Sequence, residues 1–316
     1  MLSELANLYT LQFNVFEVPK DRVPEVVLTL FDTFFTRCNI PKPEHFDCFV
    51  YCVCFNYKDV YYHNAYHALQ VLNVTWTLAK KCDMINKLNP HILFAALVSA
   101  FVHDIGHPGT SNQFQQKTKS ELYKLYGPKS TLEHFHINLA NKCLEEHNIL
   151  SNFDDTYKQI FNKVLTECLF ATDPENHSNV FSEIKKYSFC KRADENGDEE
   201  YVIENINYES IDDQITIAKY LVLAADLSNP ILHYDLCRTW ASKVQDEFRC
   251  QSVCEDNLGL EQTFQMDGAF SFTMEFDYIS HIMTFWKRLT YIFPQLENEY
   301  NTLVVNYNIY KQILYY

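Results

Sequence analysis

Apolar residues recur at intervals of three and four along most of this chain, and this periodicity restricts its fold more than any other feature. The pattern is clearest in the segments EVVLTLFDTFF, HALQVLNVTWTLA, ILFAALVSAFV and YLVLAADLSNPI, which suit amphipathic or buried helices. Only 6 glycines and 10 prolines occur in 316 residues, which leaves little material for the repeated tight turns of a β-sandwich or barrel. The sequence therefore predicts an all-α fold.

The segments between these helices predict a single domain over residues 1–316. Prolines fall between or at the edges of the apolar runs, where they can begin or end helices without breaking them. Residues 191–210 are acidic and poor in apolar side chains, so we expect a solvated loop there, and a second irregular stretch from about residue 250 to 271. The apolar run over residues 92–102 is too short to cross a bilayer and predicts a core helix.

Charge and cysteine content limit the partners that we expect. Acidic residues outnumber basic ones, 41 to 26, which disfavours nucleic acid or an anionic membrane as a partner and suits a divalent cation. The 11 cysteines show no paired zinc-knuckle spacing, and we expect reduced, mostly buried thiols. No signal-peptide pattern opens the sequence. We therefore expect a cytoplasmic domain without membrane contact, with any membrane tether lying in segments outside this chain.

Two histidines, His63 and His67, are spaced so that both imidazoles can point into one cavity from the start of a helix. Such a pair alone is more often a feature of packing or of the surface than a site. His103 and Asp104 strengthen the signal, because they end an apolar helix and are followed by helix-breaking Gly and Pro. A carboxylate and an imidazole at a rigid helix end can approach a metal, and the carboxylate can bridge two ions.

Asp226 ends another apolar run, just before Ser-Asn-Pro. An isolated Asp in this position is usually a helix cap or a turn residue. Asp226 becomes a candidate metal ligand only because the chain offers other candidate ligands, His103 and Asp104 among them.

Three motifs in order resemble those of class I cyclic nucleotide phosphodiesterase catalytic domains. They are His63-Asn64-x-x-His67, His103-Asp104-x-x-His107-Pro108-Gly109 and Ala225-Asp226-x-x-Asn229-Pro230. The likeness extends loosely from about residue 10 to 312. It implies a compact, HD-like bundle of some sixteen helices, with a nucleotide pocket where helical subdomains meet.

The resemblance also implies two metal ions and a role for each motif residue. A tight site, usually zinc, would be held by His67, His103, Asp104 and Asp226. Asp104 would also reach a second ion, usually magnesium or else manganese, whose waters His107, Glu133 and Thr172 would orient. A hydroxide activated by both metals would attack the cyclic phosphate, and His63 would donate a proton to the departing 3′ oxygen.

The same resemblance assigns a nucleotide pocket. Its predicted residues are Tyr62, Leu227, Asn229, Val244, Phe248, Thr273 and Phe276, with Phe276 as the aromatic clamp on the base. The family normally has a glutamine three residues before this clamp, where the alignment places Thr273. A carboxylate near the C-terminus that steadies the general acid is replaced by Val304, with Glu297 or Glu299 as substitutes.

The predicted function is hydrolysis of 3′,5′-cyclic nucleotide to the 5′-monophosphate, which ends cyclic nucleotide signalling. Asn229 followed by Pro230 resembles the cyclic AMP-preferring members of the family, which implies cyclic AMP rather than cyclic GMP as the substrate. Two alternatives stay open: a broader HD-type nucleotide phosphohydrolase, and a nucleotide-binding or scaffold module that has lost turnover. The prediction also allows for a homodimer.

Overall fold

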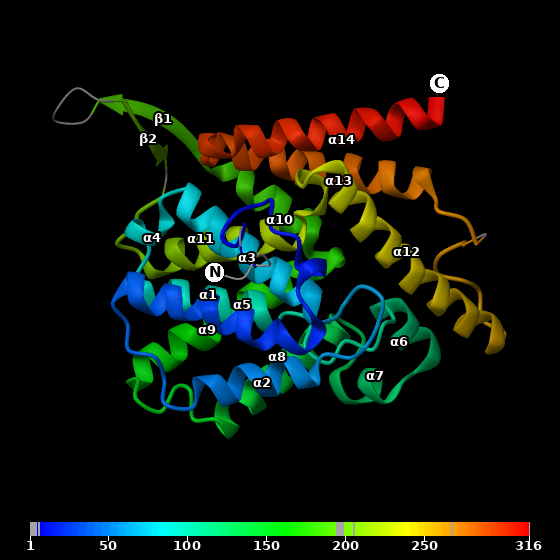
Figure 1. The fold of residues 1–316 in the computed structure, drawn as a ribbon, viewed down its shortest axis with the longest axis horizontal. Helices are drawn as coiled ribbons and strands as arrows, with labels where there is room; N and C mark the ends of the chain where they lie inside the picture. The colour runs from blue at the N-terminus through cyan, green and yellow to red at the C-terminus, as the bar shows by residue number, and fades with distance from the viewer. Residues whose placement is uncertain (1–4, 6, 194–198, 205, 267, 316) are drawn as a thin grey trace.

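The computed structural model describes residues 5, 7–193, 199–204, 206–266 and 268–315, which are almost entirely helical (Figure 1). The α-helices are α1 (Val23–Cys38), α2 (Phe46–Asn56), α3 (Ala65–Lys81), α4 (Met84–Lys87), α5 (Pro90–Val102), α6 (Asn112–Thr118), α7 (Glu121–Tyr126), α8 (Thr131–Glu146), α9 (Asp155–Thr172), α10 (His177–Glu183), α11 (Ile211–Asp226), α12 (Tyr234–Asn257), α13 (Phe272–Ile292) and α14 (Glu297–Tyr315). The 3-10 helices are η2 (Val15–Glu17), η3 (Lys20–Arg22), η4 (Pro174–Asn176), η5 (Ile184–Lys186), η6 (Asn229–Ile231) and η7 (Pro294–Leu296). The prediction of an all-α fold is confirmed.

Two predicted loops are shorter than expected. Within the segment 191–210, which was expected to be a loop, strands β1 (Ser188–Ala193) and β2 (Glu199–Glu204) pair antiparallel as a hairpin. The hairpin projects from one end of the molecule (Figure 1). The stretch expected to be irregular from about residue 250 begins instead after Asn257, because α12 continues for two more turns. Its many polar residues hid this continuation of the helix, although Gln251, Ser252 and Glu255 are buried there.

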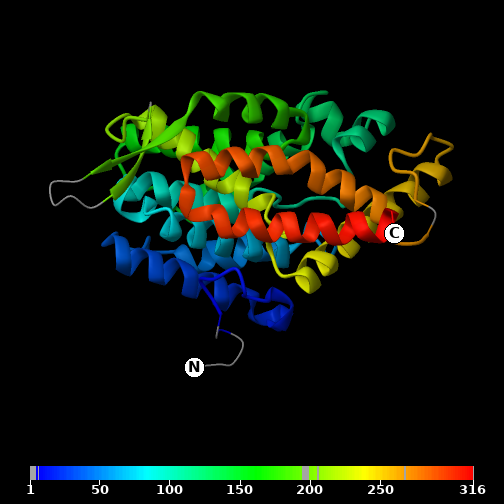
Figure 2. The same ribbon diagram turned by 90° about the horizontal axis from the view of Figure 1, so that it is seen from above.

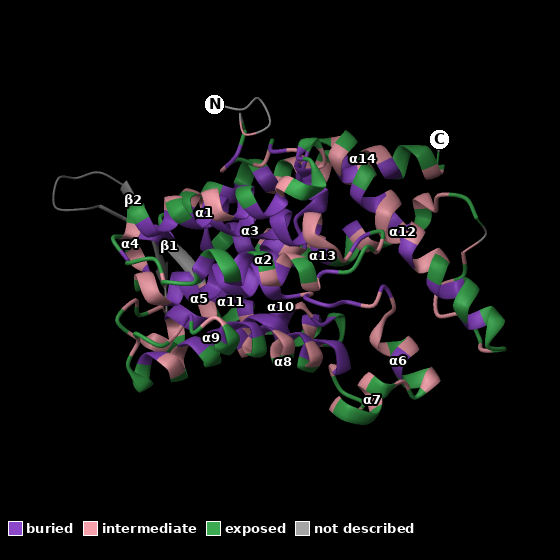
Figure 3. Cartoon of the chain, turned by 60° about the horizontal axis from the view of Figure 1, so that its bottom comes forward, coloured by how far each residue is buried: buried purple, intermediate pink, exposed green. Residues whose placement is uncertain are grey.

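Four helices form the centre of the molecule. Helix α5 packs against α3, α9 and α11, and α11 also packs against α3 and α9. Pro90 begins α5, as predicted, and every residue of α5 from Ile92 onward is buried. A helix that is apolar on all sides is stable only when it is surrounded by other elements. The burial map shows this core as an almost continuous buried region through α3, α5 and α11 (Figure 3).

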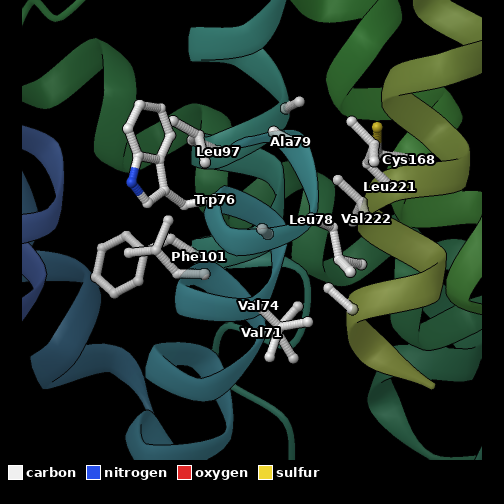
Figure 4. Packing of buried hydrophobic residues seen from close by; sticks show 14 of the residues in the cluster. Val71, Val74, Trp76, Leu78, Ala79, Leu97, Phe101, Cys168, Leu221 and Val222 are labelled. Carbon is white, nitrogen blue, oxygen red and sulfur yellow. The ribbon is translucent and has the colours of Figure 1, made fainter. Parts of the chain in front are cut away.

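The close-up of this core shows how α3 joins its neighbours (Figure 4). Trp76 of α3 lies beside Leu97 and Phe101 of α5, whereas Leu221 of α11 lies near Cys168 of α9 on the other side. Full burial of a side chain the size of leucine contributes roughly 1.5–3 kcal/mol. These contacts hold the four helix axes in register and so determine where their ends meet.

Polar residues lie at one common end of these four helices. His67 is in the first turn of α3, His103 directly follows α5, Thr172 ends α9 and Asp226 ends α11. The N-terminal end of α3 therefore meets the C-terminal ends of the other three helices. Because a helix C-terminus carries partial negative charge, three of these ends favour a bound cation.

The C-terminal helices cover one side of this convergence. Helices α13 and α14 lie side by side across the core in both ribbon views (Figures 1 and 2). The Trp286 indole N–H of α13 donates to the carbonyl of Leu227 at 3.2 Å, which ties this layer to the end of α11. No helix among the described residues is both long and apolar enough to span a membrane.

Candidate active site

Four predicted metal ligands meet at the common helix end. The Nε2 atom of His103 lies 3.1 Å from Nε2 of His67 and 3.0 Å from Oδ2 of Asp104. The Nε2 atom of His67 lies 3.1 Å from Oδ1 of Asp226. A tetrahedral zinc site with ligands at about 2.0–2.1 Å has ligand–ligand edges of about 3.3–3.4 Å. The ligand atoms of His67, His103 and Asp226 lie within 4.8 Å of one another, which suits one small divalent cation, and Asp104 lies against both imidazoles.

A backbone hydrogen bond orients one imidazole of the cluster. The Nδ1–H of His103 donates to the Ala100 carbonyl at 3.0 Å, so Nε2 of His103 points toward Asp104 and Asp226. Burial opposes ionisation of Asp226, but hydrogen bonds from His103 and His67 outweigh it and lower the pKa of this carboxyl. Two buried imidazole nitrogens and two carboxylates facing one another need a cation between them. The donor set is thus chemically suited to a metal.

A second cluster uses the other oxygen of Asp104. Its Oδ1 lies 3.8 Å from Nε2 of His136, and the nitrogens of His107 and His136 lie within 4.8 Å of an Asp104 oxygen. The Nδ1–H of His136 donates to the Ile105 carbonyl at 2.7 Å, and burial lowers the pKa of His136 to about 4. Asp104 is therefore placed to bridge two cations, the second of which would have few protein ligands.

His63 lies at the rim of this cluster and pairs with Glu247 of α12. The His63 Nδ1–H donates to Oε1 of Glu247, and the backbone N–H groups of Tyr62 and His63 donate to Oε2 at 2.8 and 3.1 Å. Burial opposes protonation of His63, but the negative charges of Glu247 and Asp104 raise the pKa of this imidazole to about 9. His63 is thus held as an imidazolium whose other nitrogen, Nε2, is available as a proton donor.

The three residues predicted to orient water lie around the same cavity. The His107 ring stacks on His63 with centroids 3.9 Å apart, and its Nδ1 accepts the Gly109 N–H at 3.0 Å. Glu133 accepts from Nδ2 of Asn112 at 2.9 Å, and burial, together with the charge of Asp173, raises the pKa of Glu133 to about 8. Thr172 lines the cavity, although its hydroxyl donates to the Leu169 carbonyl at 2.8 Å.

A cavity of about 420 Å³ opens from the metal cluster, a size typical of small-molecule sites. Five of the seven residues predicted to bind the nucleotide line it: Tyr62, Leu227, Asn229, Val244 and Phe248. The Nδ2–H of Asn229 donates to the Tyr62 hydroxyl at 2.7 Å, which fixes both side chains. Phe248 stacks on Phe264, which also lines the cavity, with ring centroids 3.8 Å apart.

The structure does not bring Thr273 and Phe276 to this cavity. Thr273 is exposed, and Phe276 packs against the ring of Tyr307 in α14 with centroids 4.9 Å apart. The cavity is lined instead by Glu275 and Tyr278 of the same helix. The physical reason is helical phase: the buried stripe of α13 runs through Glu275, so its neighbour Phe276 points about 100° away from it.

The carboxylate that supports His63 is also not where the sequence comparison placed it. Val304 and Glu299 belong to α14, where Glu299 forms an ion pair with Lys81 of α3, and Glu297 is exposed. Glu247 of α12 provides this carboxylate instead. Glu247 is 4% exposed and lies on the same helix as two pocket residues, three positions after Val244 and one before Phe248.

Sequence reasoning missed Glu247, His136, Glu275 and Tyr278. Helical periodicity offers a signal for two of them. Glu275 shares the buried stripe of α13 with Ile279, Ile282 and Trp286, and a carboxyl at such a position needs a partner or a ligand. Glu247 likewise lies on the buried face of α12. His136 and Tyr278 have no comparable signal, because either side chain is ordinary in a helix that packs on a core.

The sequence is also similar to known cyclic nucleotide phosphodiesterases. The sequence profile of the 3′5′-cyclic nucleotide phosphodiesterase family matches residues 62–303. A probable 3′,5′-cyclic-AMP phosphodiesterase, pde-4, of Caenorhabditis elegans is 28% identical over 265 residues, covering 81% of this chain and 38% of that protein. A cGMP-specific 3′,5′-cGMP phosphodiesterase 3 of Dictyostelium discoideum is 23% identical over 316 residues, covering 98% of this chain and 64% of that protein. The chain thus spans less than two thirds of these relatives.

Solved structures share the fold. The phosphodiesterase domain of the RhoPDE fusion protein from the choanoflagellate Salpingoeca rosetta superimposes with a TM-score of 0.83 at 24% identity, covering 98% of this chain and 96% of that one. The profile match covers more than half of the chain and includes every residue of the two clusters and the His63–Glu247 pair. The chain belongs to the 3′5′-cyclic nucleotide phosphodiesterase family.

Proposed function

We propose that this chain hydrolyses 3′,5′-cyclic nucleotides to 5′-monophosphates with the help of two divalent cations, zinc in the tight site and magnesium or manganese in the second. One observation carries the proposal: His67, His103, Asp104 and Asp226 converge beside His63, and Asp104, Asp226 and His63 line one cavity of nucleotide size. Bound divalent cations lower the pKa of a water toward neutrality and offset negative charge on phosphate oxygens.

The side chains around the cavity have different roles in the proposed reaction. With a metal bound, the imidazoles of His67 and His103 would be neutral ligands, and the carboxylates of Asp104 and Asp226 would supply the two negative charges that neutralise one dication. Asp104 extends its second oxygen toward the other cluster. Glu133 and Thr172 line the cavity beside this cluster and offer oxygen atoms that can orient water.

His63 acts as the general acid in the proposed reaction. Water adds its oxygen to phosphorus and loses a proton to solvent, the bond from phosphorus to the 3′ oxygen breaks, that oxygen takes a proton from Nε2 of His63, and His63 regains a proton from solvent. Glu247 holds the opposite nitrogen and keeps the imidazole protonated before the step. A positioned general acid of this kind contributes typically 10²–10⁴-fold to the rate.

The base preference is the finer part of the proposal. We infer a preference for cyclic AMP, supported by Asn229-Pro230 and by relatives such as pde-4 of Caenorhabditis elegans that are named for that nucleotide. The Dictyostelium discoideum relative, named as cGMP-specific, is the counterexample within the same family.

The test is a steady-state assay of purified protein with zinc and magnesium, following release of 5′-AMP and 5′-GMP from cyclic AMP and cyclic GMP by chromatography. We expect the 5′-monophosphate as the sole product and a higher kcat/KM for cyclic AMP. Nucleotide binding without turnover would favour a binding module, and hydrolysis of non-cyclic nucleotides would favour a broader phosphohydrolase. Either result would overturn the proposal.

A further inference from the structure

Glu275 is a buried carboxyl group of the cavity without a partner. It is 4% exposed and lines the cavity, yet no side-chain hydrogen bond or ion pair joins it to a described residue. Leaving such a group unsatisfied costs about 1–3 kcal/mol or more. A buried carboxyl that opens only on a ligand cavity is therefore a candidate for direct contact with the ligand.

Other buried or half-buried carboxyl and amide groups that line the cavity are already engaged within the described part of the chain. Gln245 uses both ends of its amide, donating to the Ser271 carbonyl at 2.9 Å and accepting its N–H at 2.7 Å. Gln251 does the same with Ser111, and Asn112 with Glu133 and Leu132. The Glu275 side chain thus has no hydrogen-bond partner among the described residues. Its carboxylate can accept hydrogen bonds from a ligand, and its protonated form can also donate one.

Tyr278 places an aromatic surface next to Glu275. The two residues are three apart on α13, and side chains at this spacing are neighbours on a helix face. Burial and the negative charges of Asp226 and Glu275 raise the pKa of Tyr278, so the Tyr278 side chain is close enough to both carboxylates to feel their charge. A base stacked on Tyr278 would present its edge to Glu275 while its phosphate reaches the metal cluster.

We propose that the Glu275 carboxyl reads the purine edge and makes base selection depend on its own protonation, favouring adenine as the neutral acid and guanine as the carboxylate. The inference rests on the proposed function, because it assigns a role within the same cavity. A carboxylate offers two acceptors, which match the N1–H and N2–H₂ donors of guanine. A neutral carboxyl offers one donor and one acceptor, which match N1 and N6–H₂ of adenine.

The surroundings of Glu275 keep both protonation states accessible near neutral pH. Burial raises the pKa of Glu275 to about 7, opposed by the positive charge of Arg238 of α12. Cys237 of α12 and Tyr310 of α14 also face Glu275, and its charge contributes to raising the pKa of both. Arg238 does not pair with Glu275 directly; its guanidinium donates to the Ser242 hydroxyl at 2.8 Å and lies over the ring of Phe270.

The test measures kcat/KM for cyclic AMP and cyclic GMP from about pH 6 to about pH 8, a range that includes the ionisation expected for Glu275. The ratio of the two constants is the readout, because ionisations of the metal cluster and of His63 affect both substrates alike and cancel. We expect the ratio of cyclic GMP to cyclic AMP to rise about tenfold across this range, as expected for one bidentate contact. A flat ratio in the unaltered protein would overturn the inference.

Two variants and one control test whether Glu275 is the group whose ionisation changes the substrate ratio. In Glu275→Gln the amide does not titrate, so the ratio should become independent of pH. In Arg238→Met the loss of positive charge should move the midpoint of the ratio to higher pH. Glu299→Gln, which removes a buried carboxyl outside the cavity, should keep the original midpoint. A pH-dependent ratio that survives in Glu275→Gln would assign the effect to another group.

Binding measurements separate this inference from the proposed function. Calorimetric affinities of 5′-AMP and 5′-GMP over the same pH range give a second ratio that does not require turnover. Absence of hydrolysis with a pH-dependent binding ratio would contradict the proposed function and support the role of Glu275. Hydrolysis with flat ratios in both measurements would support the proposed function and contradict the role of Glu275.

Discussion

At the scale of single residues, the site depends on imidazole and carboxylate groups that meet at distances a divalent cation can bridge. The Nε2 atoms of His67 and His103 face each other at 3.1 Å, with carboxylate oxygens of Asp104 and Asp226 alongside. His63 stands outside this set and pairs with Glu247. The proposed metal ligands and the proposed general acid are therefore separate sets of residues, which substitutions can distinguish.

Substitution of each type of residue should show this separation. His63→Ala should retain bound metal but lose about 10²–10⁴-fold in kcat, because only the general acid is removed. Asp226→Ala should lose both metal and turnover, because a charged ligand is removed. Metal content by mass spectrometry and steady-state turnover test this prediction. Equal metal content in the two variants would contradict the assigned roles.

Glu247→Gln should change the pH profile of hydrolysis. His63 acts as an acid, so activity falls on the alkaline side as this imidazole loses its proton. The Glu247 carboxylate raises the pKa of His63, so its replacement by a neutral amide should lower that pKa and move the alkaline limb of kcat/KM to lower pH. The control is Glu255→Gln, a buried glutamate of the same helix outside the cavity lining, which should leave the limb in place. An unmoved limb in Glu247→Gln would show that Glu247 does not tune His63.

At the scale of elements, the turn after α5 determines how the ligands leave the helix. Gly106 has a φ of +77°, and a Cβ there would lie 2.7 Å from Cδ2 of Leu139 and 3.0 Å from the Phe135 ring. The turn also holds the His107 N–H on the Asp104 carbonyl at 3.0 Å. This tight reversal directs Asp104 and His107 into one cavity from adjacent positions.

Gly106→Ala should therefore lower the free energy of unfolding by about 2–4 kcal/mol, combining the left-handed backbone with overpacking against α8. Gly259→Ala is the matched control, because Gly259 has a φ of +67° but open space around it. It should cost only the backbone contribution of about 1 kcal/mol. Urea denaturation of both variants gives the comparison, and equal costs would show that packing at Gly106 is not the cause.

At the scale of the whole molecule, metal binding should be linked to folding, because the four ligands come from helices far apart in sequence and meet only in the folded chain. A ligand at one hundred times its Kd stabilises the folded state by about 2.7 kcal/mol. For a domain of this size we expect zinc to raise the Tm by about 5 °C. Calorimetry should show this rise in the unaltered protein and in His63→Ala, but not in Asp226→Ala. A rise in all three would place the stabilising metal elsewhere.

The state of association and the cellular location stay predictions. Light scattering of the purified protein distinguishes a homodimer, which the prediction allows, from a single chain of 37.3 kDa. The cytoplasmic location rests on composition and awaits imaging of the full protein.

The sequence by itself determined the helical fold and indicated the residues that we propose as metal ligands. Apolar spacing predicts helices because the same 3.6-residue period that forms a helix also defines its buried face. The motifs around His67, His103 and Asp226 are local, so each could be recognised without knowing which helices pack together.

Only the tertiary structure decided which carboxyl supports His63 and which residues of α13 face the cavity. The partner of His63 lies 184 positions away at Glu247, and nothing local to either residue specifies that pairing. A shift of two positions separates Thr273 from Glu275, and such a shift changes the facing side chain because neighbouring residues of a helix point about 100° apart. Contacts of α13 with α14 set that rotation, since the ring of Phe276 packs on Tyr307 and leaves Glu275 toward the cavity.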